Sequence, residues 1–275
     1  MLSKLGPYLN PDLFDSIGNT PLIYTTECDD TNAMSILIKN GANVNQKSQI
    51  KQLTPLAAAI LQHNNRSVAF LLKKNANPNG LVVDSVSPLM LAANSGLYAS
   101  CSLLIDHGAD INYYHPKWGS PLLFSINNSD YKISEMLLNL NANINVVDSN
   151  GEPLIILASA GNDTQSVGLL LSHGVAIDMP NIKGNSALKI AALGGLTEMV
   201  NFLLKNGSNP SLLGPKENHF SPAMYAILGN QYECAKVLLP LDINFRKPII
   251  RERWIAMARM SKHFEIAELI EQTTK

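Results

Sequence analysis

The chain has 275 residues, of which 46% are apolar and 16% are charged, with a formal net charge of −1. This composition excludes a disordered chain, because there is ample apolar material for a core and little charge to oppose folding. The near-zero charge also gives no overall field that would attract nucleic acid or an anionic membrane.

The cysteines and the N-terminal segment bear on where the protein works. Cys28, Cys101 and Cys234 are odd in number and far apart, which argues against a disulfide framework or a zinc cluster. The first residues lack the apolar stretch of a signal peptide, and no later run approaches about 18 apolar residues. We expect an intracellular, cytoplasmic protein with reduced thiols, no membrane insertion, no cofactor and no metal.

A tripeptide of hydroxyl residue, proline and leucine recurs along the chain. Its clear copies are Thr20-Pro21-Leu22, Thr54-Pro55-Leu56, Ser87-Pro88-Leu89 and Ser120-Pro121-Leu122, with starts 34, 33 and 33 residues apart. Weaker copies continue the series with steps of 32, 34 and 35 at Glu152-Pro153-Leu154, Ser186-Ala187-Leu188 and Ser221-Pro222-Ala223. Seven successive registers indicate a repeat protein.

Each interval between tripeptides holds two short apolar-periodic stretches, which predict two helices. The hydroxyl should cap the first helix, and proline suits its first position, where an N–H has no partner anyway. Residues that tolerate left-handed geometry stand where the second helix should end. They are Gly41, Asn75, Gly108, Asn141, Gly174 and Gly207. We expect His107 and His173 to face the negative end of their helices.

An Asn- or Asp-containing segment follows each helix end, as in Gly41-Ala42-Asn43-Val44-Asn45, and predicts a hairpin-like finger. With this turn, the two helices and Thr-Pro-Leu, the unit resembles an ankyrin repeat. The resemblance implies an all-α repeat solenoid of about seven full repeats in a single domain, 1–275. We expect a partial repeat over 1–15, a C-terminal capping repeat over 248–275, and full repeats at 16–48, 49–82, 83–115, 116–148, 149–181, 182–216 and 217–247.

The histidine that ankyrin repeats carry after Thr-Pro-Leu is missing. Apolar residues replace it in the units that keep the proline, namely Ile23, Ala57, Met90, Leu123 and Met224. We therefore expect apolar packing in place of the turn-bridging hydrogen bond. Gly194-Gly195 fits the glycine that usually ends the first helix.

No pattern in the sequence points to catalysis. A phosphate-binding glycine loop, a paired-histidine metal helix and a nucleophile elbow are all missing. We expect Cys101 and Cys234 to pack in the core and Cys28 to be more accessible. The chain is predicted to be a monomer and not an enzyme.

The finger at residues 113–119 is the most informative segment, because it carries three large aromatic residues where such fingers are normally polar. Aromatic residues are enriched at protein interfaces. We assign Tyr113, Tyr114, Lys117 and Trp118 to partner binding; the alternative is that the rings pack on neighbouring fingers.

Two further surfaces complete the prediction. The resemblance implies that the pair before the end of each first helix faces a partner; we select Leu61, Gln62, Asn94, Ser95, Asn127 and Asn128. A secondary basic patch holds Arg246, Lys247, Arg251 and Arg253, which either form a solvated face or bind an acidic peptide or phosphate.

The resemblance implies a protein-protein interaction module, acting as adaptor, scaffold or inhibitor for a protein partner. Three alternatives stay open: an effector of an intracellular bacterium acting in the host cytoplasm, a targeting arm of a longer enzyme, and a substrate of asparaginyl hydroxylases at Asn112. The last rests on the spacing from Leu104 to Asn112.

Overall fold

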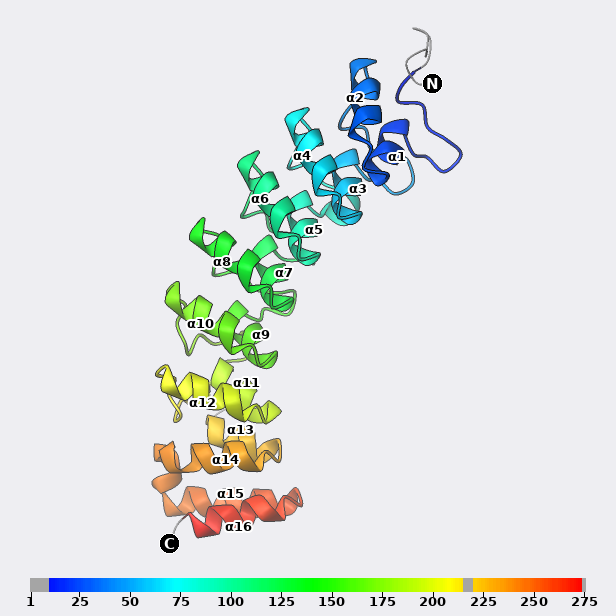
Figure 1. The fold of residues 1–275 in the computed structure, drawn as a ribbon. Helices are drawn as coiled ribbons and strands as arrows, with labels where there is room; N and C mark the ends of the chain where they lie inside the picture. The colour runs from blue at the N-terminus through cyan, green and yellow to red at the C-terminus, as the bar shows by residue number, and fades with distance from the viewer. Residues whose placement is uncertain (1–9, 215–219, 274–275) are drawn as a thin grey trace. The chain divides into compact units, whose positions relative to one another are not determined.

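The computed structural model describes residues 10–214 and 220–273, and it consists of short helices joined in pairs (Figure 1). The chain divides into two compact units, residues 1–143 and 144–275, which are described separately. Most of the predicted partial repeat at 1–15 lies outside the described residues. In the described ranges, β-structure is limited to isolated bridges between His115 and Gly119 and between Val147 and Pro153. None of the helices there is both long and apolar enough to span a bilayer.

The first unit contains four helix pairs, as the repeat register predicts. The first helices stack side by side in one layer, and the second helices form the other layer (Figure 1). The pairs are α1 (Pro21–Glu27) with α2 (Thr31–Lys39), α3 (Pro55–Leu61) with α4 (Asn65–Lys73), α5 (Pro88–Asn94) with α6 (Tyr98–Asp106), and α7 (Pro121–Asn127) with α8 (Tyr131–Asn139).

The second unit repeats this arrangement. Its pairs are α9 (Leu154–Ala160) with α10 (Thr164–Ser172), α11 (Ala187–Gly194) with α12 (Thr197–Lys205), α13 (Pro222–Leu228) with α14 (Tyr232–Leu238), and α15 (Pro248–Met260) with α16 (Phe264–Gln272). The 3-10 turns η4 (Leu239–Leu241) and η5 (Ile243–Arg246) connect α14 to α15. The last pair falls within the predicted capping repeat, and α15 has 13 residues where α13 has 7.

The hydroxyl caps are confirmed in three repeats. The side chains of Thr54, Ser87 and Ser120 accept hydrogen bonds from the backbone N–H three residues later, at 3.1, 3.2 and 3.2 Å. Thr20, Ser186 and Ser221 also precede a helix, but their hydroxyls are buried and have no partner among the described residues. The residue type therefore predicts where the helix begins better than it predicts the capping bond.

One predicted register is wrong by a residue. Proline was expected at the first helical position of the repeat at 149–181, but Pro153 is the N-cap and α9 begins at Leu154. Glu152 instead closes the finger, where its N–H donates to the Asp148 side chain at 2.8 Å and its carbonyl accepts from the Asp148 N–H at 3.1 Å. With Pro153 in the capping position, the steps on either side, from Ser120 and to Ser186, both become 33 residues.

As predicted, a residue with positive φ follows the C-cap of these second helices. Gly41 and Gly108 have φ of 92° and 85°, and Asn75 and Asn141 take the same slot with φ of 61° each. Left-handed geometry raises the conformational free energy of any residue with a Cβ, and Asn is among the residues for which this cost is smallest.

The core of each unit comes from leucines in register. The leucine of the clear tripeptides and one leucine of each second helix from α2 to α14 are at most 4% exposed. In the first unit these are Leu22, Leu56, Leu89 and Leu122 with Leu37, Leu71, Leu104 and Leu137. The residues in the family's histidine slot are buried as well, which agrees with the expected apolar packing.

The fingers are joined by a ladder of hydrogen bonds that the sequence did not predict. In the first unit, a side-chain oxygen near the end of one finger accepts the backbone N–H of an Asn or Asp in the next finger. In each of these bonds the backbone N–H of the first residue donates to the side-chain oxygen of the second, at 2.7–3.0 Å: Asn43 to Asp12, Asn77 to Asn45, Asp110 to Asn79, and Asn143 to Asn112. In the second unit, Asn209 donates in the same way to Asp178 at 3.0 Å. The frequent Asn in the fingers thus connects repeats as well as turning the chain.

Candidate protein-binding surface

The six residues predicted to face a partner lie at the C-terminal ends of α3, α5 and α7, in the first unit, and are called the floor below. Leu61, Gln62, Asn94, Asn127 and Asn128 are exposed. Ser95, the remaining member, is half-buried. These helices stack side by side, so their ends form a row that advances by one repeat at a time.

A hydrogen bond ties two repeats together within this floor. The Nδ2 of Asn128 donates to the Asn94 carbonyl at 2.8 Å, and it lies 3.5 Å from the Asn94 Oδ1. The bond holds one amide in a fixed orientation, while the exposed side chain of Asn127 belongs to the same helix end. Fixed amides present donors and acceptors that a partner backbone can match.

Two residues of this surface, and a third that is buried beneath it, were missed in the sequence. Ala58, Leu91 and Phe124 each lie three residues before a floor residue, so helix geometry puts them on the same face, one turn nearer the finger. Ala58 is buried, whereas Leu91 and Phe124 are half-buried. The three-residue spacing and the 33-residue repeat were the signals that identify them. Leu91 and Phe124 make the middle of the surface apolar and leave its edge polar.

The aromatic finger is held by a turn at residues 115–119. The His115 N–H donates to the Gly119 carbonyl at 2.8 Å, and the His115 ring nitrogen accepts the N–H groups of Lys117 and Trp118 at 3.2 and 3.3 Å. In the fingers that start at Asp15 and Asp148, the aspartate carboxylate accepts backbone N–H groups two and four residues later. His115 therefore shapes the turn that carries its aromatic neighbours.

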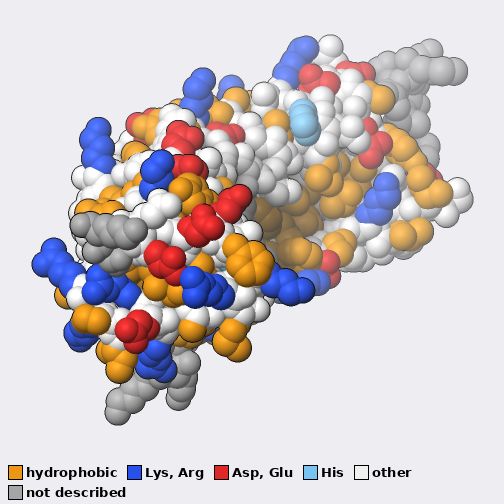
Figure 2. Space-filling model, turned by 90° about the horizontal axis from the view of Figure 1, so that it is seen from below, with side chains coloured by type: hydrophobic (Ala, Val, Ile, Leu, Met, Phe, Trp, Pro, Cys, Tyr) orange, Lys and Arg blue, Asp and Glu red, His pale blue; other side chains and the backbone are white. Residues whose placement is uncertain are grey.

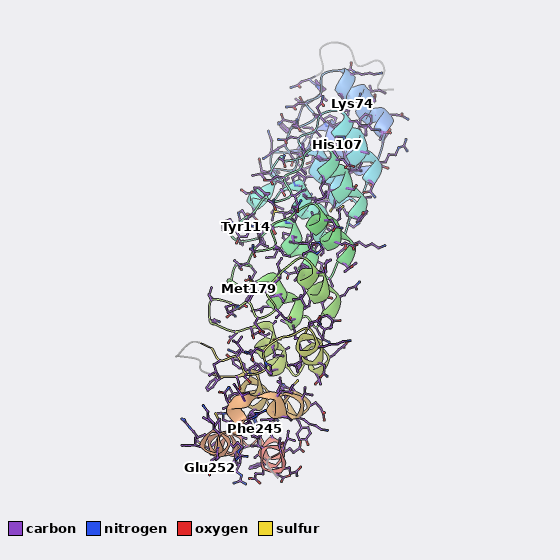
Figure 3. All side chains as sticks on the ribbon, turned by 90° about the vertical axis from the view of Figure 1, so that its left-hand side faces the viewer. Lys74, His107, Tyr114, Met179, Phe245 and Glu252 are labelled. Carbon is purple, nitrogen blue, oxygen red and sulfur yellow. The ribbon has the colours of Figure 1, made fainter. Side chains whose placement is uncertain are left out.

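The three aromatic residues have different surroundings. The Tyr113 hydroxyl donates to the Ser85 carbonyl of the preceding finger at 2.7 Å, so Tyr113 braces two fingers. Trp118 is half-buried, and the Lys117 Nζ lies 4.3 Å from the centre of its ring. Tyr114 is 41% exposed and projects from the finger side of the molecule (Figure 3). Packing on a neighbouring finger thus describes Tyr113 best, and Tyr114 presents the most accessible ring.

The finger and the floor are the two ends of one surface and not a single cluster. The finger turn precedes α7, and Asn127 is the last residue of α7. This helix of 7 residues therefore separates the finger from the floor. At 1.5 Å per residue this is about 10 Å. Phe124 lies between them, so a partner that reaches both ends would cross a half-buried aromatic ring.

The predicted basic patch belongs to the second unit. Arg246, Lys247 and Arg253 are exposed, while the Arg251 guanidinium lies 6.0 Å from the centre of the Phe245 ring. An ion pair joins nearby Arg259 to Glu271 at 2.5 Å.

The remaining candidates for chemistry have structural surroundings. His107 and His173 each place Nδ1 within 3.0 Å of a carbonyl of their own helix, as predicted for helix ends. Cys101 is buried, and burial raises the pKa of its thiol to about 12. Cys28 is exposed, as expected. Within the described ranges, no three His, Cys, Asp or Glu side chains are grouped to hold a metal.

Comparison with known proteins supports the repeat assignment. The profile of the family described as Ankyrin repeats (3 copies) matches residues 8–81, 30–115, 122–213 and 154–249. A fowlpox virus (strain NVSL) protein described as an ankyrin repeat protein, FPV216, is 40% identical over 73 residues. That match spans 26% of this chain and 25% of the viral protein.

Solved structures show the same fold. The ankyrin repeat domain of Bcl-3, a member of the IkappaB protein family, matches with a TM-score of 0.68 and 25% identity, over 76% of this chain and 94% of that domain. The ankyrin repeat domain of human ASB11 matches with a TM-score of 0.62 and 24% identity, over 74% and 90%.

Proposed function

Because the chain belongs to the ankyrin repeat family, whose domains generally mediate protein-protein interaction, we propose that it binds a protein partner on the first unit, as an adaptor, scaffold or inhibitor. The binding surface would run from the finger at 113–118 across Leu91 and Phe124 to the amides of Asn94, Asn127 and Asn128. The observation that carries the proposal is Tyr114, a large ring left 41% exposed on a finger that hydrogen bonds fix in place.

The composition of this surface suits a protein ligand. Exposed or half-buried rings supply apolar contact area at low entropic cost, and a polar rim fixes orientation. Ankyrin repeat proteins are typically not enzymes, and the surface holds no cluster of acid, base and nucleophile among its described residues. The free thiols of Cys28, Cys101 and Cys234 fit a reducing compartment, so we place this binding inside a cell.

Mutation of two tyrosines tests the proposal. Tyr114 and Tyr98 are both exposed, at 41% and 48%, but Tyr98 begins α6 in the layer of second helices. A partner isolated from cell extract with the full chain should bind Tyr114→Ala more weakly by about 2 kcal/mol, which is roughly thirtyfold in Kd. Its affinity for Tyr98→Ala should stay within about threefold of the unmutated chain.

Isothermal titration calorimetry of the purified pair measures both constants. Equal losses in the two variants, or a loss confined to Tyr98→Ala, would place the interface elsewhere. Thermal unfolding of each variant controls for folding.

A further inference from the structure

A hollow lies between α13 and α15 in the second unit. Two adjoining cavities of about 220 and 480 Å³ share the side chains of Phe220, Met224, Ile250 and Trp254. The larger one is within the size range of pockets that hold small ligands. Figure 2 views the molecule from its C-terminal end, where Lys and Arg side chains lie among hydrophobic side chains and those of Asp and Glu.

One wall of the hollow is formed by side chains of the long helix α15. Ile250, Trp254 and Met257 follow spacings of four and three residues, so they share one face of this helix. The Trp254 ring stacks on Phe245 with ring centres 5.8 Å apart, and the Arg251 guanidinium lies near that second ring. This stacking holds the Trp254 ring in place on the wall of the hollow.

Two apolar side chains that line the hollow are partly exposed to solvent. Phe220 and Leu213 are 38% and 36% exposed, and both line the smaller cavity. A ligand with an apolar group would cover them and gain the free energy of burying that surface.

The rim of the hollow is cationic. Lys247 lines the smaller cavity and Arg253 the larger one, and Arg246 is next to Lys247 in the chain. Among the described residues, none of these three is in an ion pair. Glu252, the nearest acid in sequence, is two residues from Ile250 and Trp254, so helix geometry turns it about 160° away from each of these two side chains. Asp242 is buried and accepts bonds from Asn244.

We propose that this hollow binds an acidic segment of a partner protein that carries one bulky apolar side chain. The apolar group would fill the space between Met224 and Trp254, and flanking carboxylates would pair with Lys247 and Arg253. Charge complementarity selects this occupant, because Lys247 and Arg253 line the two cavities beside apolar side chains, and neither is in an ion pair among the described residues. The site lies in the second unit and is independent of the surface proposed above on the first unit.

The test uses the full chain and short synthetic peptides in fluorescence anisotropy. Each peptide has a central Phe or Ala flanked by Glu, Ser or Lys. We expect the Glu-flanked Phe peptide to bind most tightly. Its Kd should rise at least about tenfold in Arg253→Glu and be largely retained in Arg253→Lys. Lys205→Glu at the end of α12 is the matched control and should bind normally, as should Tyr114→Ala.

Three results would overturn the proposal. The Glu-flanked Phe peptide would bind no better than its Ala or Ser counterpart, or Lys205→Glu would weaken binding as much as Arg253→Glu. Alternatively, vesicles of equal parts phosphatidylcholine and phosphatidylserine would bind the chain through Arg253 while no peptide did, which would assign the patch to a lipid surface.

Discussion

Lys189 is the residue whose place in the molecule is least expected. It occupies the slot of the family's histidine in α11, and it is fully buried. Its Nζ donates to the Gly184 carbonyl at 3.3 Å and lies 6.0 Å from the centre of the Tyr225 ring. Burial lowers the pKa of Lys189 below its ordinary value of 10.5, and the negative charge of Asp178 offsets only part of this effect.

This pKa predicts how stability depends on pH. A lowered pKa in the folded state means that the unfolded chain binds the proton more tightly, so protonation favours unfolding. The free energy of unfolding should therefore rise as pH rises from the folded pKa of Lys189 toward 10.5. Lys189→Met should remove this dependence and be more stable than the unmutated chain at pH 7, with the difference shrinking toward pH 10.

Urea unfolding at several pH values measures this difference. Lys189→Arg is the informative second variant, because it stays charged over the whole range and should be less stable throughout. A constant difference between Lys189→Met and the unmutated chain from pH 7 to pH 10 would contradict the assignment.

At the scale of single elements, the helix caps separate what sequence predicts from what it does not. Ser87 and Ser186 are the same residue type in the same repeat position, and both are buried. Only Ser87 makes the capping bond. The position of each cap follows from the repeat, but the hydroxyl's partner depends on backbone details at the start of each helix, which the sequence pattern does not specify.

A pair of matched substitutions checks this distinction. Ser87→Ala should lower the free energy of unfolding by about 1 kcal/mol, because it removes a capping bond. Ser186→Ala should cost less than about 0.5 kcal/mol, since its buried hydroxyl has no bond to lose. Chemical denaturation of both variants gives the comparison, and equal losses would show that Ser186 is also a functional cap.

The finger ladder makes a second prediction for elements. Asn79 accepts the Asp110 N–H at 2.8 Å and donates to the Gly108 carbonyl at 2.9 Å, so it joins two fingers twice. Asn79→Ala should cost about 1–2 kcal/mol of stability. Asn79→Asp should recover part of this, because Asp12 and Asp178 serve as acceptors at equivalent places. If Asn79→Asp is no more stable than Asn79→Ala in the same denaturation experiment, the acceptor role assigned to Asn79 is wrong.

At the scale of the whole molecule, the repeat period made the helices and most of their limits predictable. The 33-residue step places the helix pairs because successive repeats bury apolar residues, most often leucine, at the same positions against their neighbours. The error at Glu152 arose because Pro-Leu occurs there one residue early, and only the closed finger at 148–152 shows where α9 begins.

The candidate surface was less predictable than the fold. The sequence identified the aromatic finger, but it did not separate Tyr113, which braces the finger at Ser85, from Tyr114, which remains accessible. That difference depends on the Ser85 carbonyl, which accepts the bond from Tyr113. Ser85 has a φ of 56° and lies in the turn η2 (Val83–Ser85). Such contacts between neighbouring fingers are set by local backbone conformation and leave no periodic signal.

The most direct test of the central claim is photo-crosslinking of the full chain to its partner. A p-benzoylphenylalanine residue is placed at Tyr114, at Asn127 or at Tyr98, and crosslinked products are identified by mass spectrometry. Binding along the finger and the first helices predicts that one protein is crosslinked from both Tyr114 and Asn127 and not from Tyr98. A partner crosslinked from Tyr98 alone would contradict this account.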